Sequence, residues 1–317
     1  MVGSYATGLT MKVKRLPSTG ETLLGTGYRV DYGGKGSNQA VGCARLGAKV
    51  NLLARIGQDA FGQMALRLYR EEGIETSYVE QVKTAPTGVG FILVEEESGH
   101  NCIAIDPGAN DSLDASDIQS HEAALRGAAV VLTQLEIPVQ AAEAALVRGR
   151  AFGATTILNP APVRPLPSSF LRQIDILTPN LVEGKVLAGL SHDSATGPAE
   201  IAEKLLNQGV KQVVMTMGEK GALIVTSSSQ TMVPAIRETA IDTTGAGDAF
   251  NAGLATALAN GATIEEAVQL GVVIGGLAIT KEGVIPSLPR RDEVISAHQR
   301  HGLSVPDWLA KDFPVTA

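Results

Sequence analysis

The sequence predicts an α/β fold, with a doubly wound, mostly parallel sheet flanked by helices. Short apolar runs alternate with helix-forming stretches from residue 128 to residue 281. These runs lack an in-out alternation, which is typical of strands buried on both faces of a parallel sheet. Two further segments, 9–32 and 87–106, are instead rich in β-forming residues and bounded by glycine. They break this rhythm and predict further β-strands.

The first helix is expected at 39–46, after the glycine-rich run 33–38, with Ser37 or Asn38 as its cap. Segments 88–94 and 101–105 are expected to pair as a hairpin around an acidic turn. The parallel strands are expected at 128–133, 155–158, 174–177 and 213–216, with a turn at 216–221. The remaining helices are expected at 141–148, 181–190, 199–207, 246–260 and 263–281.

Composition narrows the function classes. The chain has 317 residues, 44% of them hydrophobic, and 26 basic against 33 acidic residues give a net charge of −7. That charge argues against a nucleic-acid partner. Cys43 and Cys102 suggest a reducing compartment. No apolar run approaches the roughly 18–20 residues of a membrane span, and the first residues show no signal-peptide pattern, so we expect no membrane partner and a cytoplasmic location.

The most informative motif is Asp-Thr-Thr-Gly-Ala-Gly-Asp at 242–248, which runs directly into an expected helix. Gly245, Ala246 and Gly247 form a glycine-rich helix start, whose N–H groups and dipole attract an anion. A carboxylate there, Asp248, would repel a resting phosphate, so its expected use is to take a proton from a nucleophile during phosphoryl transfer. An ordinary helix start with two turn glycines is the alternative.

Seven other segments accompany this motif in a fixed order: 3–4, 17–22, 33–40, 134–136, 159–162, 178–183 and 216–221. The ordered set resembles the PfkB/ribokinase family of carbohydrate and nucleoside kinases. The resemblance implies an ATP-dependent kinase that phosphorylates a hydroxymethyl group of a sugar, a pentose or related polyol. The alternatives are a nucleoside or other small-metabolite kinase of the same family and a non-catalytic sugar-binding regulator. Neither a Walker A loop nor a Gly-x-Gly-x-x-Gly fingerprint is present in the sequence.

Sugar contacts are expected from Gly34, Lys35 and Asn38, together with Asp248, because repeated glycines permit close backbone approach and an asparagine both donates to and accepts from hydroxyls. The alternative is a run that merely turns the chain into the next helix. Glu136 follows a buried strand, where the carboxyl end of a parallel strand opens into the ligand crevice. It too is expected to face the sugar.

The resemblance also implies nucleotide and ion sites. Asn180 and Glu183 would organise Mg²⁺, although the same pair reads as a helix-capping box, and both interpretations can hold. The nucleotide would be bordered by Asn180, Thr216, Gly218, Gly221 and Gly247. A K⁺ ion would be enclosed by Asp242, Thr244, Gly283 and Ser287.

By the same resemblance, segments 9–32 and 87–106 form a β lid over the sugar site, through which a homodimer is expected. Segments 1–8, 33–86 and 107–317 then form the α/β core with the nucleotide site.

The chain departs from the family pattern near its start. Ala6 and Gly8 stand where many relatives have an Asn-x-Asp pair whose carboxylate binds sugar hydroxyls, so ribose is expected to be a poor substrate. Tyr5 and Thr7 still offer hydroxyls. A buried strand is expected before Gly3, yet two residues precede it. Either the sheet tolerates a stub there or the natural chain starts upstream, and the second is favoured.

Overall fold

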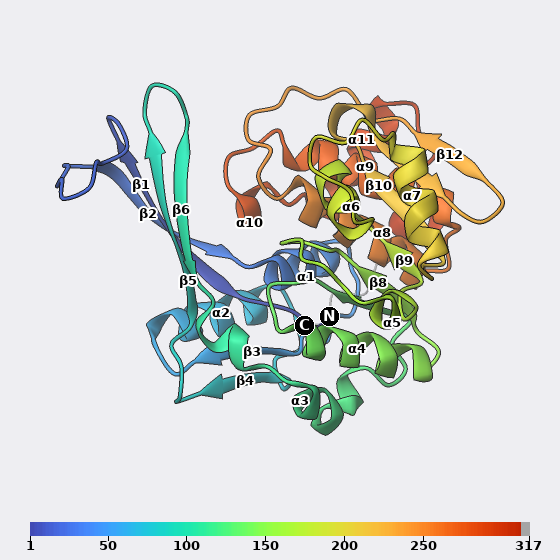
Figure 1. Ribbon diagram of the computed structural model, residues 1–317, viewed down its shortest axis with the longest axis horizontal. Coiled ribbons are helices and arrows are strands. Elements are labelled where there is room, and N and C mark those ends of the chain that lie inside the picture. Colours follow the sequence, from blue (N-terminus) through green and yellow to red (C-terminus); the bar gives the residue numbers. More distant parts are fainter. Residues whose placement is uncertain (312–317) are drawn as a thin grey trace.

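A six-stranded sheet forms the centre of the computed structural model, which describes residues 1–311 (Figure 1). The strand order is β12-β11-β10-β9-β8-β7, with parallel neighbours from β7 to β10 and antiparallel β11 and β12 at one edge. The strands are β7 Val130–Thr133, β8 Thr155–Leu158, β9 Ile176–Leu177, β10 Gln212–Thr216, β11 Ala222–Val225 and β12 Gln230–Val233. The predicted doubly wound sheet is confirmed. Residues 312–317 of the expected core lie outside the described range.

Helices cover both faces of this sheet. Successive residues of a strand point to opposite faces, so they pack into two different hydrophobic cores. Val131 and Leu158 pack into one core, and Leu132 and Ile157 into the other. The first core is covered by α3 Ala115–Ser120, α4 Val139–Ala151, α5 Ser168–Leu171, α6 Leu181–Leu187 and α7 Pro198–Asn207. The second is covered by α1 Lys35–Arg45, α2 Ala60–Glu71, α8 Ala246–Ala259, α9 Ile264–Ala278, α10 Val284–Ser287, α11 Arg291–Arg300 and α12 Asp307–Ala310. Within residues 1–311 we find no helix with the length and apolar character to cross a membrane.

Val2 extends the central sheet at its other edge. It forms parallel bridges to Thr133 on one side and Leu53 on the other. Through Val2 the sheet meets a two-stranded parallel pair, β3 Ala54–Gly57 and β4 Val79–Val82. Val2 thus occupies the place in the sheet where a strand was expected before Gly3. The sequence analysis did not anticipate β3, β4 or α2.

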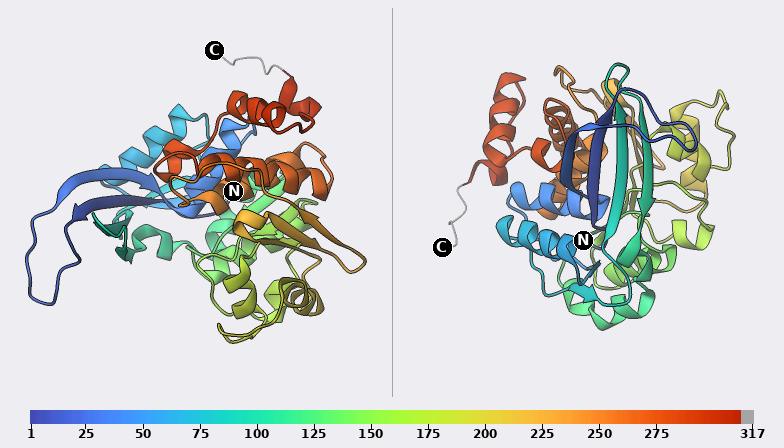
Figure 2. Two further views of the ribbon diagram at one scale, coloured as in Figure 1. Left: turned by 90° about the horizontal axis from the view of Figure 1, so that it is seen from above. Right: turned by 90° about the vertical axis from the view of Figure 1, so that its left-hand side faces the viewer.

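A separate four-stranded sheet, here called the small sheet, extends away from the core (Figure 2). Its order is β2-β1-β5-β6, with β1 antiparallel to β2 and parallel to β5, and β5 and β6 forming the predicted hairpin. The strands are β1 Ala6–Val13, β2 Thr26–Gly33, β5 Gly88–Glu95 and β6 Asn101–Asp106. Short 3-10 helices occur at Gly108–Ser112, Glu122–Ala124 and Gly218–Lys220.

The first helix differs from the prediction. Helix α1 begins at Lys35 instead of residue 39, and its N-cap is Gly34 with φ 88°, so neither Ser37 nor Asn38 caps it. A Cβ at Gly34 would lie 2.7 Å from the Ala6 nitrogen. Glycine alone lets β2 pass directly into the helix here. Shorter than predicted are β9, α6 and α9.

Candidate active site

The N-terminal turns of α1 and α8 meet at Asp248. This side chain is 4% exposed. Its Oδ2 accepts a hydrogen bond from Asn38 Nδ2 at 2.8 Å, and its Oδ1 accepts one from Gln39 Nε2 at 2.9 Å. Two such bonds to a charged acceptor fix the orientation of the carboxylate. The structure brings the predicted residues Asn38 and Asp248 into contact, and it adds Gln39, which the sequence analysis missed.

Gln39 belongs to an amide network behind Asp248. Its Nε2 also donates to Asn159 Oδ1 at 3.1 Å, and its Oε1 accepts a hydrogen bond from Gln134 Nε2. Gln134 and Asn159 directly follow strands β7 and β8, at the carboxyl edge where α/β sheets bind ligands. The polar residues directly after two predicted strands, Gln134 and Asn159, were the sequence signal that could have indicated this network.

The start of α8 is shaped for an anion. Gly245 has φ 81°, and a Cβ there would lie 2.5 Å from Val284 Cγ1, so glycine is required. Gly247 and Asp248 lie in the first turn of α8, directly after Ala246. Among residues 1–311, no protein group accepts a hydrogen bond from either backbone N–H group. Free N–H groups at the start of a long helix attract negatively charged oxygens.

Asn38 also carries an unused acceptor. Its Oδ1 is buried and has no hydrogen-bond partner in the described part of the chain, whereas its amide nitrogen is committed to Asp248. A buried acceptor without a donor costs about 1–3 kcal/mol. The atom has no exposed surface in this structure, so a ligand hydroxyl would reach it only after a local side-chain movement.

Glu136 ties the first residues of the chain to α1. Its Oε2 accepts hydrogen bonds from Ser4 Oγ at 2.6 Å and from the Lys35 backbone N–H at 2.8 Å. Burial acts to lower the pKa of the Lys35 side chain, but the carboxylates of Asp248, Glu136 and Glu183 outweigh burial, and the pKa is raised. Lys35 therefore stays an ammonium under the influence of these three carboxylates.

Asn180 and Glu183 close a capping box at the start of α6, as one of the two interpretations predicted. Asn180 Oδ1 accepts from the Glu183 N–H at 2.9 Å, and Glu183 Oε2 accepts from the Asn180 N–H at 2.8 Å. Burial raises the pKa of Glu183. Asn180 forms a bridge with Thr216, so this helix start lies beside the turn that follows β10.

That turn contains Gly218 and Gly221 at φ 57° and 98°. A Cβ at Gly221 would lie 2.0 Å from the Val233 carbonyl oxygen, so the fold itself requires glycine there. Gly218 is exposed at the turn, which leaves its backbone open to a ligand. The predicted turn is confirmed.

Asp242 links two loops beside α8. Its Oδ1 accepts from the Thr244 N–H at 2.9 Å, and its Oδ2 accepts from the Gly283 N–H at 3.0 Å. Burial acts to raise the pKa of Asp242, but these hydrogen bonds and the charge of Arg29 lower it below its usual value. Ser287 is buried in the adjoining α10, and its hydroxyl donates to a backbone carbonyl at 2.8 Å.

A sequence model of the pfkB family of carbohydrate kinases matches residues 1–291. The chain belongs to this family. It is 35% identical over 295 residues to a ribokinase of Haemophilus influenzae, which covers 93% of this chain and 96% of the relative. A deoxyribokinase of Salmonella typhimurium is 34% identical over 303 residues, covering 94% and 99%. The solved ribokinase of Arabidopsis thaliana, complexed with ribose and ATP, has a TM-score of 0.86 at 31% identity, covering 93% and 96%.

Family and fold together make the protein an ATP-dependent sugar kinase with a ribokinase-like fold. Within this kinase, the departures from the family pattern lie on one face of β1. Ala6 and Gly8 point one way, whereas Tyr5 and Thr7 are fully buried with their hydroxyl oxygens 3.2 Å apart. The expectation that these two hydroxyls remain available to a sugar is wrong, because the strand alternation turns them into the core.

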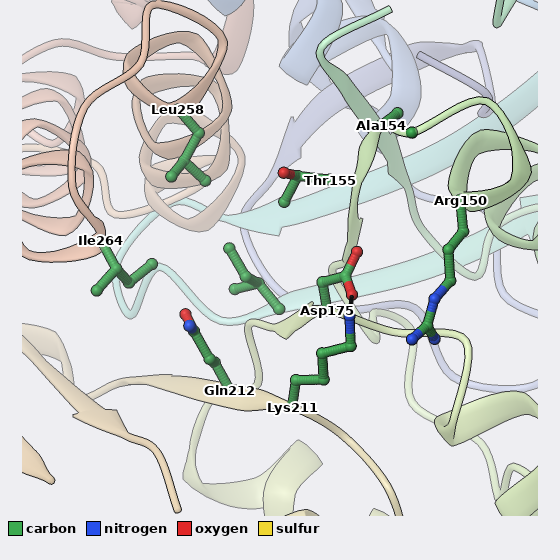
Figure 3. Close-up of a pocket in the computed structure, with 10 residues that line it drawn as sticks. Arg150, Ala154, Thr155, Asp175, Lys211, Gln212, Leu258 and Ile264 are labelled. Atoms are coloured by element: carbon green, nitrogen blue, oxygen red, sulfur yellow. Dashed lines mark ion pairs between the residues drawn. The ribbon is translucent and has the colours of Figure 1, made fainter. Parts of the chain in front are cut away.

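The kinase has a further cavity of about 560 Å³ at the amino-terminal ends of the central strands (Figure 3). Thr155, Ile176 and Gln212, the first residues of β8, β9 and β10, line it. The ion pair between Asp175 and Lys211 lies in its wall. The candidate active site sits at the carboxyl ends of these strands, so the two are separate.

Proposed function

We propose that this sugar kinase transfers the terminal phosphoryl group of ATP to a hydroxymethyl group of a pentose or a related polyol, with Asp248 as the general base. The observation that carries the proposal is the buried Asp248 carboxylate, held by Asn38 and Gln39 at the start of a helix with free N–H groups. Asp248 has both the orientation and the place to accept the hydroxyl proton as phosphate approaches.

Stabilisation of the transferring phosphoryl group falls to the first turn of α8. The backbone N–H groups of Gly247 and Asp248 are aimed at developing charge without needing to reorganise, which is the largest single term in many such reactions. Gly245 and Ala246 hold that turn in place. The Lys35 ammonium adds positive charge near Asp248.

Sugar binding is assigned to Gly34, Lys35, Asn38 and Glu136, together with Asp248. The hydrogen bond from Asn38 Nδ2 to Asp248 supports this, because it places Asn38 directly beside the proposed base. Glu136 has one oxygen engaged by Ser4 and Lys35 and can accept a sugar hydroxyl on the other. The small sheet, built around segments 9–32 and 87–106, acts as the lid over this site, and the rest of the chain forms the core with the nucleotide site.

For the nucleotide, we assign Asn180, Thr216, Gly218, Gly221 and Gly247. Their position supports this assignment. Asn180 and Thr216 form a bridge at the carboxyl end of β10, on the same side of the sheet as Asp248. Mg²⁺ bound with ATP would neutralise phosphate charge. The capping box leaves one Glu183 carboxylate oxygen free, and a carboxylate with an amide suits a hard cation that keeps its waters.

We assign a K⁺ site to Asp242, Thr244, Gly283 and Ser287. The hydrogen bonds that Asp242 accepts from the Thr244 and Gly283 N–H groups support it, because they hold both loops together beside the anion site. Activity is expected to be higher in KCl than in NaCl at equal ionic strength. Equal rates in the two salts would remove this assignment.

We further propose a cytoplasmic homodimer that pairs through the small sheet. Val30 and Phe91 lie in register on either side of Leu9 on one face, with 38% and 56% of their surfaces exposed. Apolar side chains gathered on an exposed sheet favour a partner surface. The free thiols of Cys43 and Cys102 suit a reducing compartment. Sedimentation should give a dimer, and Phe91→Glu should shift it to a monomer.

The proposed reaction is tested by incubating the protein with MgATP and a panel of acceptors: D-ribose, 2-deoxy-D-ribose, D-fructose, D-tagatose and adenosine. ADP release and the phosphorylated product are measured against a control without acceptor. Turnover of a sugar is the expected result. Turnover of adenosine alone would identify a nucleoside kinase, and binding of a sugar without turnover would identify a regulator.

A further inference from the structure

One row of residues crosses all strands of the small sheet, and we call it the cross-strand row. Gly8 of β1 pairs with Asp31 of β2 on one side and with Gly90 of β5 on the other, and Gly90 pairs with Ile105 of β6. Directly paired residues share a face of a sheet. The row therefore runs from a carboxylate, over two glycines, to an isoleucine that is 65% exposed.

An ion pair links this face of the small sheet to a loop of the core. Arg29, two residues before Asp31 on the same strand face, forms an ion pair with Glu282 of the core at 2.7 Å. Helix α10 contacts β2 (Figure 1). Beyond Asp31, the same strand continues through Gly33 into the glycine turn at the start of α1. The cross-strand row thus lies on the side of the small sheet that faces the proposed sugar site.

The two glycines of the row are not required by the backbone. Neither has a positive φ. A Cβ at Gly8 would meet nothing closer than Ile92 Cδ1 at 3.6 Å, and one at Gly90 nothing closer than Ile105 Cγ1 at 4.0 Å. Gly36, by contrast, would collide with the Ser4 nitrogen at 2.4 Å. Positions 8 and 90 could therefore each hold a methyl group in ordinary van der Waals contact with Ile92 or Ile105, and the glycines leave that volume unfilled.

Asp31 has acceptor capacity that nothing uses. In the described part of the chain no group donates a hydrogen bond to its carboxylate, and its ion pair with Arg29 spans 3.6 Å, beyond hydrogen-bond distance. Its side chain is 40% exposed. Because the Asp31 Cβ lies 3.8 Å from where a Cβ at position 8 would be, its carboxylate can reach the space over the glycines.

We propose that Asp31 is a specificity-determining residue of this kinase, which accepts hydrogen bonds from sugar hydroxyls at the end of the acceptor away from the transferred phosphoryl group. The glycines of the row leave room for an acceptor one carbon or more larger than a pentose, and Ile105 packs against its carbon face. The inference rests on the proposed sugar kinase activity and narrows its substrate class to hexose-sized, hydroxylated acceptors.

The first test removes the carboxylate. With the hexose that the wild type uses best, Asp31→Asn is expected to lower kcat/KM about ten- to hundredfold, mainly through KM, with the KM for ATP unchanged. The same variant should lose discrimination between that hexose and its deoxy analogues, which a merely structural role would not change. The matched control is Glu97→Gln, an exposed carboxylate at the turn of the β5-β6 hairpin.

The second test fills the space. Gly90→Ala should lower kcat/KM for the hexose several-fold more than for D-ribose, while Gly197→Ala should change neither. Gly197 also has no positive φ, and no atom lies within 4 Å of the position that an added methyl group would occupy there, so this variant controls for the loss of a glycine.

The outcomes separate the two levels of the proposal. No turnover of any sugar by the wild type would overturn the proposed function itself. Turnover with Asp31→Asn equal to wild type, or a wild type that prefers ribose to every hexose, would overturn this inference and leave the sugar kinase standing.

Discussion

The start of α8 and the cross-strand row of the small sheet are built in opposite ways. At α8, Asp248 is buried, with 4% of the residue exposed, and both its carboxylate oxygens accept hydrogen bonds from α1. In the row, the Asp31 side chain is 40% exposed and accepts none from the described residues. The chemistry of transfer demands a preorganised base, whereas recognition of an acceptor can move from one strand to its neighbour. We base the proposed general base on the first region and the proposed substrate class on the second.

We expect the largest effect on activity from a change at Asp248. Asp248→Asn should lower kcat by on the order of 10²–10⁴, because the amide cannot take the hydroxyl proton. ATP affinity should change little. Steady-state kinetics measure the loss, and an unchanged thermal unfolding midpoint shows that the fold is intact. Near-normal turnover would show that Asp248 is not the base.

A second prediction concerns the carboxylate that binds the acceptor sugar, moved from Asp31 on β2 to position 8 on β1. The double change Ala6→Asn and Gly8→Asp, made together with Asp31→Ala, should raise kcat/KM for ribose about ten- to hundredfold. With Asp31 retained, the gain should be smaller, because two carboxylates directly across a strand pair repel each other. The full set of single and combined variants measures this coupling. An equal gain in both backgrounds would contradict it.

A smaller effect is expected at the nucleotide side of the site. Glu183→Ala should raise the Mg²⁺ concentration for half-maximal activity about tenfold, and by more than it raises the sugar KM. The change also removes a capping box. Glu266→Ala removes the equivalent box from α9, far from the site, and should leave the Mg²⁺ dependence unchanged. If both variants behave alike, Glu183 is only a cap.

The smallest effect concerns the loop that precedes α8. The pKa of Asp242 is lowered in the folded protein from its ordinary value of 3.8, so its stabilisation is present above that value and is lost as the pH falls through the folded pKa. Asp242→Asn should therefore lower Tm by a few degrees at pH 7 and by less at pH 3. Asp193→Asn, which changes a fully exposed carboxylate, should show no such dependence.

Local patterns predicted what local geometry determines. The motif at 242–248 indicated a glycine-started helix with Asp248 in its first turn, and the structure has it so. Asn180 and Glu183 were recognised as a capping box because both partners lie within four residues. The start of α1 was misplaced, since polar Ser37 and Asn38 suggested a cap that Gly34 makes unnecessary.

Contacts between distant segments were beyond the sequence. Gln39 looked like any polar helix residue, and its role depends on which way α1 faces α8. The pairing of Asp31 with Gly8 depends on the irregularity between Thr10 and Lys12, which shifts the register of β1 against β2. A one-residue shift would have put Asp31 on the other face.

The hydrogen bond between Asn38 and Asp248 spans 210 positions of the chain. Joining segments so far apart carries a large loop-closure entropy, and contacts of high sequence separation form slowly. The proposed base and the side chain that orients it therefore come from different halves of the polypeptide. A growing chain gains the Asp248 constellation only after α8 has been made, and on refolding, recovery of turnover should trail recovery of the helical circular dichroism signal. Turnover should therefore report that α1 and α8 have packed together, which circular dichroism alone does not measure.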